Sequence, residues 1–327
     1  MLQLEAEGKL SLNDSLQKWP PDILGTNYDE STITIRHLLG QTSGIFDYTN
    51  DDGFLTAILT KEGFEANRFK NYSVQDLINY AKAHPPVFVP GTSWEYSNTN
   101  YILAGMVIKA VTGNTWNKEV YNRILRPLHM TETTSAGSQT GLPQPFARAY
   151  HIYSTDPATR TYTDTTLHNM SWANSAGDLI TTTAEENRFF KALMKGQLLP
   201  PSQLAKMKTV TMLDENLGYG LGILWSRLSC DSRGFWSHSG GVVGYATDNG
   251  VTDDGRRSTV LSMSTTSFSD DTYINEVYET SAAMIAYALC GDQPTNRTAE
   301  QGNGPATSTV DRVPADAAQQ LRNRLRL

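Results

Sequence analysis

The spacing of apolar residues changes once along the chain, and this change limits the folds that it can adopt. Up to about residue 195 they recur at helical spacing, as over 98–112. From 217 to 265 the stretches are short and extended, with a turn at 253–255. Such short connections join antiparallel strands, so we expect an antiparallel sheet followed by a helix over 272–289. The expected strands are 217–229, 234–238, 244–251 and 256–265.

Length and composition exclude several classes of protein. The 327 residues suit one large domain or two ordinary ones, at about 100–200 residues each, and 39% of them are hydrophobic, enough for a sizeable core. A net charge of -7 argues against nucleic acid as the main partner, because phosphate binding needs a basic surface. No run approaches the length of a membrane-spanning helix. The 6 histidines and 2 cysteines show no zinc spacing, so we expect neither a metal nor a cofactor.

The two cysteines leave two alternatives open. Cys230 and Cys290 lie 60 positions apart and form either one disulfide or two buried thiols. A disulfide closing such a loop contributes on the order of 4 kcal/mol in the chain-entropy model, and it indicates an oxidising compartment. The first residues show no signal peptide, since no basic region precedes an apolar stretch.

The two ends of the sequence have unusual patterns. Residues 1–7 have a helical pattern that Gly8 closes, but no capping residue begins it. A frayed terminal helix is one interpretation; we expect instead that the chain starts inside a longer helix. From 291 to 327 the chain is rich in Gly, Pro, Thr, Asn and Ala, which favours a disordered tail.

Three short segments have the residue types of a catalytic site. Tyr96 and Asn98 stand at the start of a helix, where Asn can cap and Tyr can project into a cleft. The segment 238–241 ends one strand and leads into another, and 175–179 precedes a helix cap. Each pattern is weak alone, because Tyr-x-Asn occurs three times in this sequence. Neither the G-x-S-x-G pattern nor a glycine-rich phosphate loop is present.

Taken in order, these segments resemble the serine β-lactamase and D-alanyl-D-alanine carboxypeptidase superfamily. The resemblance is greatest to the secreted DD-carboxypeptidases that use Y-x-N and H-x-G motifs, and it runs from Met1 to about Gly291. It is carried by 2–10, 33–44, 46–50, 90–91, 96–101, 171–177, 218–222, 228–230 and 238–245.

The resemblance implies a β-lactamase/transpeptidase-like α+β fold, with an antiparallel sheet flanked by helices and a mainly helical subdomain. Residues 1–45 and 205–290 would form a discontinuous α/β part, and 46–204 the helical part. The active-site cleft would lie between these two parts.

The nucleophile that the resemblance implies is absent from this sequence. The family forms a serine ester through an S-x-x-K motif on a buried helix just upstream of the segment that matches 2–10. The one literal match is Ser15 with Lys18, which we reject because 19–21, Trp-Pro-Pro, ends any helix there. We therefore expect an N-terminally truncated chain that forms no acyl-enzyme.

The resemblance also implies catalytic roles for four residues. Tyr96 would be the general base and acid, although a phenol ionises near neutrality only beside cations. One cation would be the motif lysine, and His238 is a second candidate. Asn98 would orient that lysine and the substrate amide. The Gly241 N–H would be one oxyanion donor.

Substrate binding is expected at a second group of residues. Ser239, with Gly240, would bind the substrate's terminal carboxylate, for which a carboxypeptidase also needs a cation. The DD-carboxypeptidases place an Arg where this sequence has Trp225. Arg227 lies two residues further, so strand alternation predicts that it substitutes. Trp172 is expected either to line the cleft or to belong to the core.

The resemblance thus predicts a secreted D-alanyl-D-alanine carboxypeptidase that acts on peptidoglycan stem peptides and is inhibited by β-lactams. Its partner would be a small peptide ending in D-Ala-D-Ala. An esterase, a β-lactamase or a D-aminopeptidase of the same superfamily remains open. A non-catalytic binder of peptidoglycan peptides is a further alternative.

Overall fold

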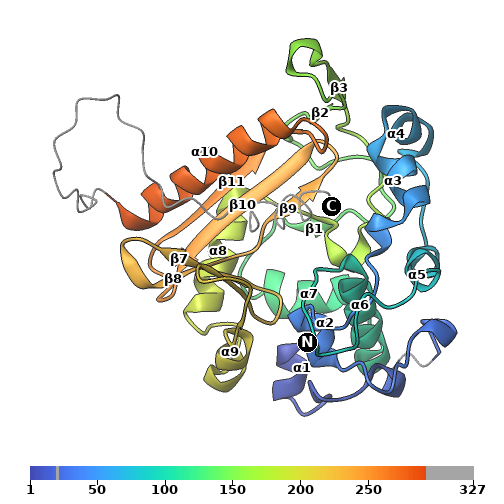
Figure 1. Ribbon diagram of the computed structural model, residues 1–327. Coiled ribbons are helices and arrows are strands. Elements are labelled where there is room, and N and C mark those ends of the chain that lie inside the picture. The colour runs from blue at the N-terminus through green and yellow to red at the C-terminus, as the bar shows by residue number, and fades with distance from the viewer. Residues whose placement is uncertain (20–21, 292–327) are drawn as a thin grey trace.

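The computed structural model describes residues 1–19 and 22–291. Its main element is a seven-stranded sheet in the order β11-β10-β8-β7-β6-β5, with β9 paired to β10 (Figure 1). All its pairs are antiparallel. The mixed helix and sheet fold predicted from the sequence is confirmed; the expected tail, after its first residue Gly291, lies outside the described residues. The strands are β5 (Thr211–Met212), β6 (Leu217–Tyr219), β7 (Leu224–Leu228), β8 (Asp231–Ser237), β9 (Gly240–Val242), β10 (Tyr245–Thr252) and β11 (Ser258–Met263).

Two of the expected strands are each divided in the structure. The stretch 217–229 forms a hairpin of β6 and β7, because the chain reverses at Gly222, whose φ of 77° lies in the left-handed region that glycine adopts without strain. The stretch 256–265 ends its pairing with β10 at Met263, and β12 (Thr265–Thr266) pairs with β2 (Tyr150–Ile152) instead.

Two helices cover opposite faces of the sheet. Both α8 (Thr183–Met194) and α10 (Asp271–Cys290) pack against β10 and β11 (Figure 1). A Cβ added to Gly250 of β10 would lie 2.8 Å from the side chain of Ile285 on α10, so glycine allows this close approach. Asn249, the residue before Gly250 in β10, donates a hydrogen bond to Glu186 of α8. It therefore points to the opposite face of the sheet, as alternation along a strand requires.

Most of the remaining helices lie to one side of the sheet, where α2, α5 and α7 pack against α6 (Figure 1). The sequence predicts a helix over 98–112, and α6 has these bounds, with Gly113 closing it in the left-handed region. Helix α5 begins at a capping box of Ser73 and Asp76. These helices are α1 (Leu2–Ala6), α2 (Ile35–Gly40), α3 (Asp52–Leu59), α4 (Lys61–Asn67), α5 (Val74–Lys82), α6 (Asn98–Thr112), α7 (Trp116–Val120) and α9 (Pro201–Met207).

Short elements connect the middle of the chain to the rest of the fold. β1 (Thr134–Ser135) pairs with β4 (Leu179–Ile180), and β2 also pairs with β3 (Tyr162–Asp164). One apolar cluster includes Leu38 of α2, Leu103 of α6 and Val251 of β10, so the N-terminal segment, the helices and the sheet share a core. Helix α8, which the prediction assigned to the helical part, lies against the sheet.

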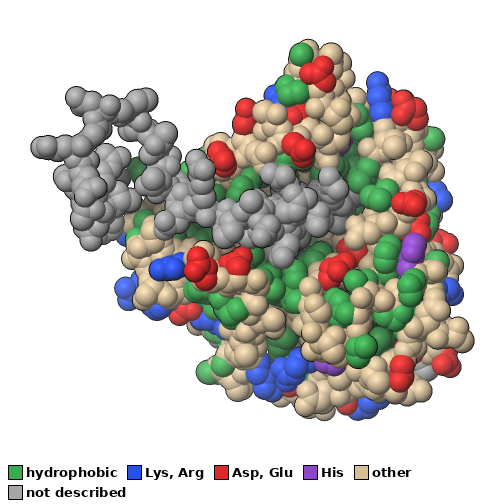
Figure 2. Space-filling view, in the orientation of Figure 1, with side chains coloured by type: hydrophobic (Ala, Val, Ile, Leu, Met, Phe, Trp, Pro, Cys, Tyr) green, Lys and Arg blue, Asp and Glu red, His purple; other side chains and the backbone are tan. Residues whose placement is uncertain are grey.

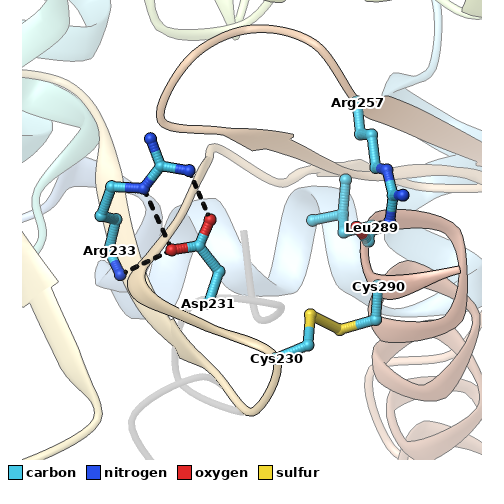
Figure 3. The surroundings of a disulfide bond; sticks show 6 residues. All are labelled: Cys230, Asp231, Arg233, Arg257, Leu289 and Cys290. Atoms are coloured by element: carbon cyan, nitrogen blue, oxygen red, sulfur yellow. Dashed lines mark hydrogen bonds and ion pairs between the residues drawn. A yellow bond between two sulfur atoms is a disulfide. The ribbon is translucent and has the colours of Figure 1, made fainter. Parts of the chain in front are cut away.

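A disulfide joins Cys230 and Cys290, with their Cα atoms 5.8 Å apart (Figure 3). It connects the β7–β8 turn to the last residue of α10. Arg257 donates a hydrogen bond of 2.8 Å to the carbonyl of Leu289 beside it. The structure therefore selects the disulfide from the two alternatives that the sequence left open. In the parts of the chain that the structure describes, we find no helix that could span a membrane.

Candidate active site

A cavity of about 710 Å³ lies between the sheet and the segments that precede and follow α6. On the face of the molecule turned toward the viewer, Figure 2 shows a hollow near the middle in which hydrophobic side chains gather. The described residues that line the cavity include Tyr96, Asn98, His238 and Ser239 through Gly241. The structure thus brings the Tyr-x-Asn segment and the 238–241 segment, far apart in the sequence, to one cavity.

Asn98 has a different local role from the expected one. The N-cap of α6 is Ser97, and Asn98 is the first helical residue. Its Nδ2 donates to Oδ2 of Asp47 at 3.0 Å and to Oγ1 of Thr49 at 3.4 Å. The other oxygen of Asp47 accepts from the Thr49 N–H, and burial raises the pKa of Asp47 to about 6. Because a carboxylate oxygen only accepts when ionised, Asp47 fixes the orientation of the Asn98 amide.

The imidazole of His238 is oriented by hydrogen bonds on both sides. Its Nδ1 lies 2.8 Å from the carbonyl oxygen of Ser239, which can only accept, so Nδ1 carries a hydrogen. In the neutral ring Nε2 is then the acceptor, 3.2 Å from the hydroxyl of Tyr219. The Tyr219 hydroxyl is hydrogen-bonded to that of Tyr101, and burial raises the pKa of Tyr101, which therefore stays protonated.

Tyr96 completes an aromatic cluster around this chain of hydrogen bonds. Its ring centroid lies 6.1 Å from that of His238, 5.9 Å from that of Tyr101 and 6.4 Å from that of Tyr219. Sequence reasoning assigned no role to Tyr101 or Tyr219. Both lie in segments that carry the family resemblance, 96–101 and 218–222. That position in the sequence could have marked them as candidate site residues.

The segment 239–241 leaves its main chain accessible. Gly240 and Gly241 belong to β9 and pair with Thr247 and Ala246 of β10. A Cβ added to either glycine would meet no atom within 4 Å. Protein packing therefore does not demand glycine at these positions, whereas the close approach of a ligand to the main chain would favour it.

Trp172 belongs to both the cavity and the core. It lines the cavity with only 5% of its surface exposed, and its carbonyl accepts a hydrogen bond of 2.7 Å from the hydroxyl of Tyr48. Its ring packs edge-on against Phe54, with the centroids 5.9 Å apart. The two alternatives that the sequence left open are thus both realised by one side chain.

The structure does not place Arg227 in the cavity. The prediction placed Arg227 on the same face as Trp225, but Trp225 is itself outside the cavity wall, and strand β7 also has a register shift against β8 between Ser226 and Leu228. The Arg227 side chain is exposed and is not part of the cavity wall. Trp225 donates from Nε1 to the carbonyl of Arg233, also outside the cavity.

Ser15 and Lys18 also lie outside the cavity wall. Ser15 precedes the short helical turn η1 (Leu16–Lys18), and Lys18 forms an exposed ion pair with Asp14 at 2.9 Å. This agrees with rejecting Ser15 as the nucleophile.

The described cavity wall is acidic. It includes Glu132 and Asp178 but no Lys or Arg. Burial raises the pKa of Asp178 to about 6, and Ser135 and the Gly137 N–H donate hydrogen bonds to it. Among the residues that the structure describes, no group of His, Cys, Asp and Glu is arranged to hold a metal ion.

Two enzymes of known structure are similar to this chain. A D-stereospecific amidohydrolase from Streptomyces sp. has a structure similar to this chain, with a TM-score of 0.77, 39% identity, and coverage of 81% of this chain and 77% of that one. A D-amino acid amidase from Ochrobactrum anthropi follows at a TM-score of 0.68 and 26% identity, covering 86% and 79%.

Two curated proteins are similar in sequence over shorter shares of their length. Protein flp of Staphylococcus aureus is 37% identical over 136 residues, which are 41% of this chain and 25% of that protein. Penicillin-binding protein 4* of Bacillus subtilis is 25% identical over 260 residues, 76% of this chain and 53% of that protein. The chain thus spans from a quarter to about half of the length of these relatives. The model of the Beta-lactamase family matches residues 1–282, and the chain belongs to this family.

Proposed function

We propose that the cavity is the acyl-transfer site of a serine hydrolase that cleaves amides of D-amino acids. The observation that carries this proposal is the charge of the described cavity wall, which holds Glu132 and Asp178 but no Lys or Arg. A substrate that ends in a carboxylate needs a cation opposite it, and the S-x-x-K lysine proposed below would instead stand beside Tyr96. A D-amino acid amide has a neutral carbonyl end and an ammonium group, which the acidic wall attracts. The likeness to a D-stereospecific amidohydrolase supports the same substrate class.

The proposed reaction proceeds through an ester. With Tyr96 held as a phenolate by the lysine of the S-x-x-K motif, a serine hydroxyl attacks the amide carbonyl and its proton passes to Tyr96, while the Gly241 N–H donates to the developing oxyanion. Tyr96 returns the proton to the departing nitrogen, ammonia leaves, and an acyl ester remains. Water, deprotonated by Tyr96, then attacks the ester; Tyr96 passes that proton to the departing serine oxygen, which releases the D-amino acid and regenerates the serine hydroxyl. Asn98, oriented by Asp47, would align the substrate amide.

The reaction needs a nucleophile that the sequence here does not contain in a suitable position. We propose that it is the serine of an S-x-x-K helix preceding Leu2, in what we name the extended form of the protein. The chain of 327 residues is then the matched control. A fluorescent penicillin should label the extended form covalently and leave the control unlabelled. Labelling of the control at Ser15 would contradict this assignment.

The substrate class is tested by steady-state kinetics of the extended form. D-phenylalanine amide should have a kcat/KM at least about tenfold above that of its L-isomer and of an acylated D-Ala-D-Ala peptide, since tenfold corresponds to 1.4 kcal/mol. Glu132→Gln should raise KM about two- to fivefold for D-phenylalanine amide, as expected for an exposed charge pair, but not for uncharged N-acetyl-D-phenylalanine amide. Equal effects on both amides would contradict attraction of the ammonium group.

D-Ala-D-Ala carboxypeptidase activity is the second candidate. Ser239 lines the cavity, where its hydroxyl can donate to a carboxylate, and a relative is named a penicillin-binding protein. If the extended form prefers the D-Ala-D-Ala peptide over D-phenylalanine amide, this candidate replaces the amidase. Secretion, predicted from the family resemblance, remains a proposal that fits the disulfide.

A further inference from the structure

The main-chain ladder along β10 is interrupted beside the cavity. β8 pairs with β10 up to Trp236, and β9 resumes the pairing at Gly240. The register is the same on both sides of the interruption, so His238 lies opposite Asn249. The structure describes both residues, and the strand pairs on either side of them are formed, but His238 and Asn249 do not pair through their main chains.

The side chain of Asn249 takes the place of the missing ladder pair. Its Oδ1 accepts from the His238 N–H at 3.1 Å, and its Nδ2 donates to the His238 carbonyl at 2.6 Å. These are the two bonds that an opposite residue makes with its own main chain in an antiparallel pair. Directly paired strands lie about 4.7–4.9 Å apart, and an amide side chain between them holds the main chains further apart.

Glu186 of α8 fixes the orientation of this amide. Its Oε1 accepts the second Nδ2 hydrogen of Asn249 at 2.8 Å. Burial raises the pKa of Glu186 to about 7, and above that pH its carboxylate only accepts, so the reverse orientation of the amide would place two acceptors against each other. Asn249 is only 2% exposed, and water cannot readily replace these partners.

We propose that Asn249, held by Glu186, is a positioning residue that sets the main-chain path from His238 to Gly241. It thereby places the His238 ring and the Gly241 N–H in the cavity. The roles of those two groups in catalysis rest on the proposed function, whereas the positioning itself does not.

The test compares Asn249→Ala with a matched control on α8, the helix that carries Glu186, both in the extended form. Asn187 follows Glu186 and accepts a hydrogen bond from Ser258 of β11, away from the cavity wall. Asn249→Ala should raise the amide exchange rate of His238 about tenfold, the equivalent of 1.4 kcal/mol, and shift its imidazole NMR signals. With D-phenylalanine amide it should lower kcat more than it raises KM, because an oxyanion donor acts mainly in the transition state. Asn187→Ala should change none of these.

Variants at Glu186 separate orientation of the amide from its mere presence. Glu186→Gln keeps an acceptor oxygen and should retain most of kcat, whereas Glu186→Leu should lose it. Asn249→Asp removes the donor to the His238 carbonyl and places two carboxylates together. Adding Glu186→Gln to it restores a hydrogen bond between α8 and β10 but not that donor. The double variant should therefore recover thermal stability over Asn249→Asp without recovering kcat.

Each outcome decides between the two proposals. If Asn249→Ala matches Asn187→Ala in amide exchange and imidazole signals, the positioning role is wrong. If the exchange and the signals change but the parent protein does not hydrolyse the amide, the proposed function fails and the positioning role stands. If Asn249→Ala does not fold, Glu186→Leu provides the same readouts, and unchanged His238 signals there would overturn the proposal.

Discussion

At the scale of single residues, the site depends on buried groups that hold its catalytic candidates. Asp47 orients Asn98, and Tyr219 and Ser239 orient His238 through its two ring nitrogens. A hydrogen bond to a charged group contributes about 1.5–3 kcal/mol, and a buried partner left without it adds a desolvation penalty. The candidates are therefore held rigidly before a substrate binds, as electrostatic stabilisation of a transition state requires.

Replacing Asp47 tests this at one position. In the extended form, Asp47→Ala should lower kcat/KM for D-phenylalanine amide about tenfold or more, because the Asn98 amide loses its charged acceptor. Asp47→Asn, which keeps an acceptor oxygen, should recover most of the loss. The measurement is steady-state hydrolysis, with circular dichroism to confirm folding. A full kcat/KM in Asp47→Ala would show that Asn98 needs no such partner.

At the scale of elements, β8, the strand that leads to His238, is held at both ends. Its start follows the turn that the Cys230–Cys290 disulfide joins to α10, and its end continues through the cavity-lining segment to β9 (Figure 3). Arg233 pairs with Asp231 at 2.8 Å in the same strand. The disulfide thus fixes the far end of the strand relative to the helix that covers it.

Removing the disulfide should lower stability and spare the cavity. Cys230→Ser with Cys290→Ser removes a constraint worth about 4 kcal/mol for a loop of this length. At about 2–4 °C per kcal/mol, Tm should fall by about 10 °C. Calorimetry measures Tm, and KM for D-phenylalanine amide at 25 °C should stay unchanged because neither cysteine lines the cavity. An unchanged Tm would show that packing of α10 alone fixes the turn.

At the scale of the whole molecule, several buried carboxyl groups make stability depend on pH. Burial is the largest cause that raises the pKa of Asp47 and Asp178 to about 6 and that of Glu186 to about 7. In the unfolded chain these groups ionise near pH 4. The folded protein therefore binds more protons between about pH 4 and 7, and the free energy of unfolding falls as pH rises through this window.

Unfolding in urea should consequently show greater stability at pH 5 than at pH 8. Glu7 acts in the opposite sense, since hydrogen bonding to Arg123 lowers its pKa to about 2, but its contribution is lost only below about pH 4.5. Burial also lowers the pKa of His37, His168 and His151, the last to about 4, so these histidines act in the opposite sense below about pH 6.5 and reduce the expected difference. Replacing Asp47 by Asn should reduce the difference between the two pH values. Equal or greater stability at pH 8 would contradict the prediction that the charged forms of these carboxyl groups destabilise the folded protein.

Local sequence patterns predicted the main helices, the approximate positions of the strands and the family. Helix α6, with Tyr96 just before it, follows from apolar spacing and Gly113, and the order of the motifs identified the family. Such features depend on neighbours a few residues apart, which the spacing of side chains along one element records.

Only the tertiary structure decided which side chains meet. It placed Asn249 opposite an interrupted ladder, joined two cysteines, and left both Trp225 and Arg227 outside the described cavity wall. It also left the described cavity wall without a Lys or Arg side chain. The proposed substrate therefore changed from a peptide that ends in a carboxylate to the amide of a D-amino acid. These outcomes depend on packing between segments far apart in the sequence. A single sequence does not determine that packing, because many pairings of strands and helices are compatible with the same hydrophobic pattern.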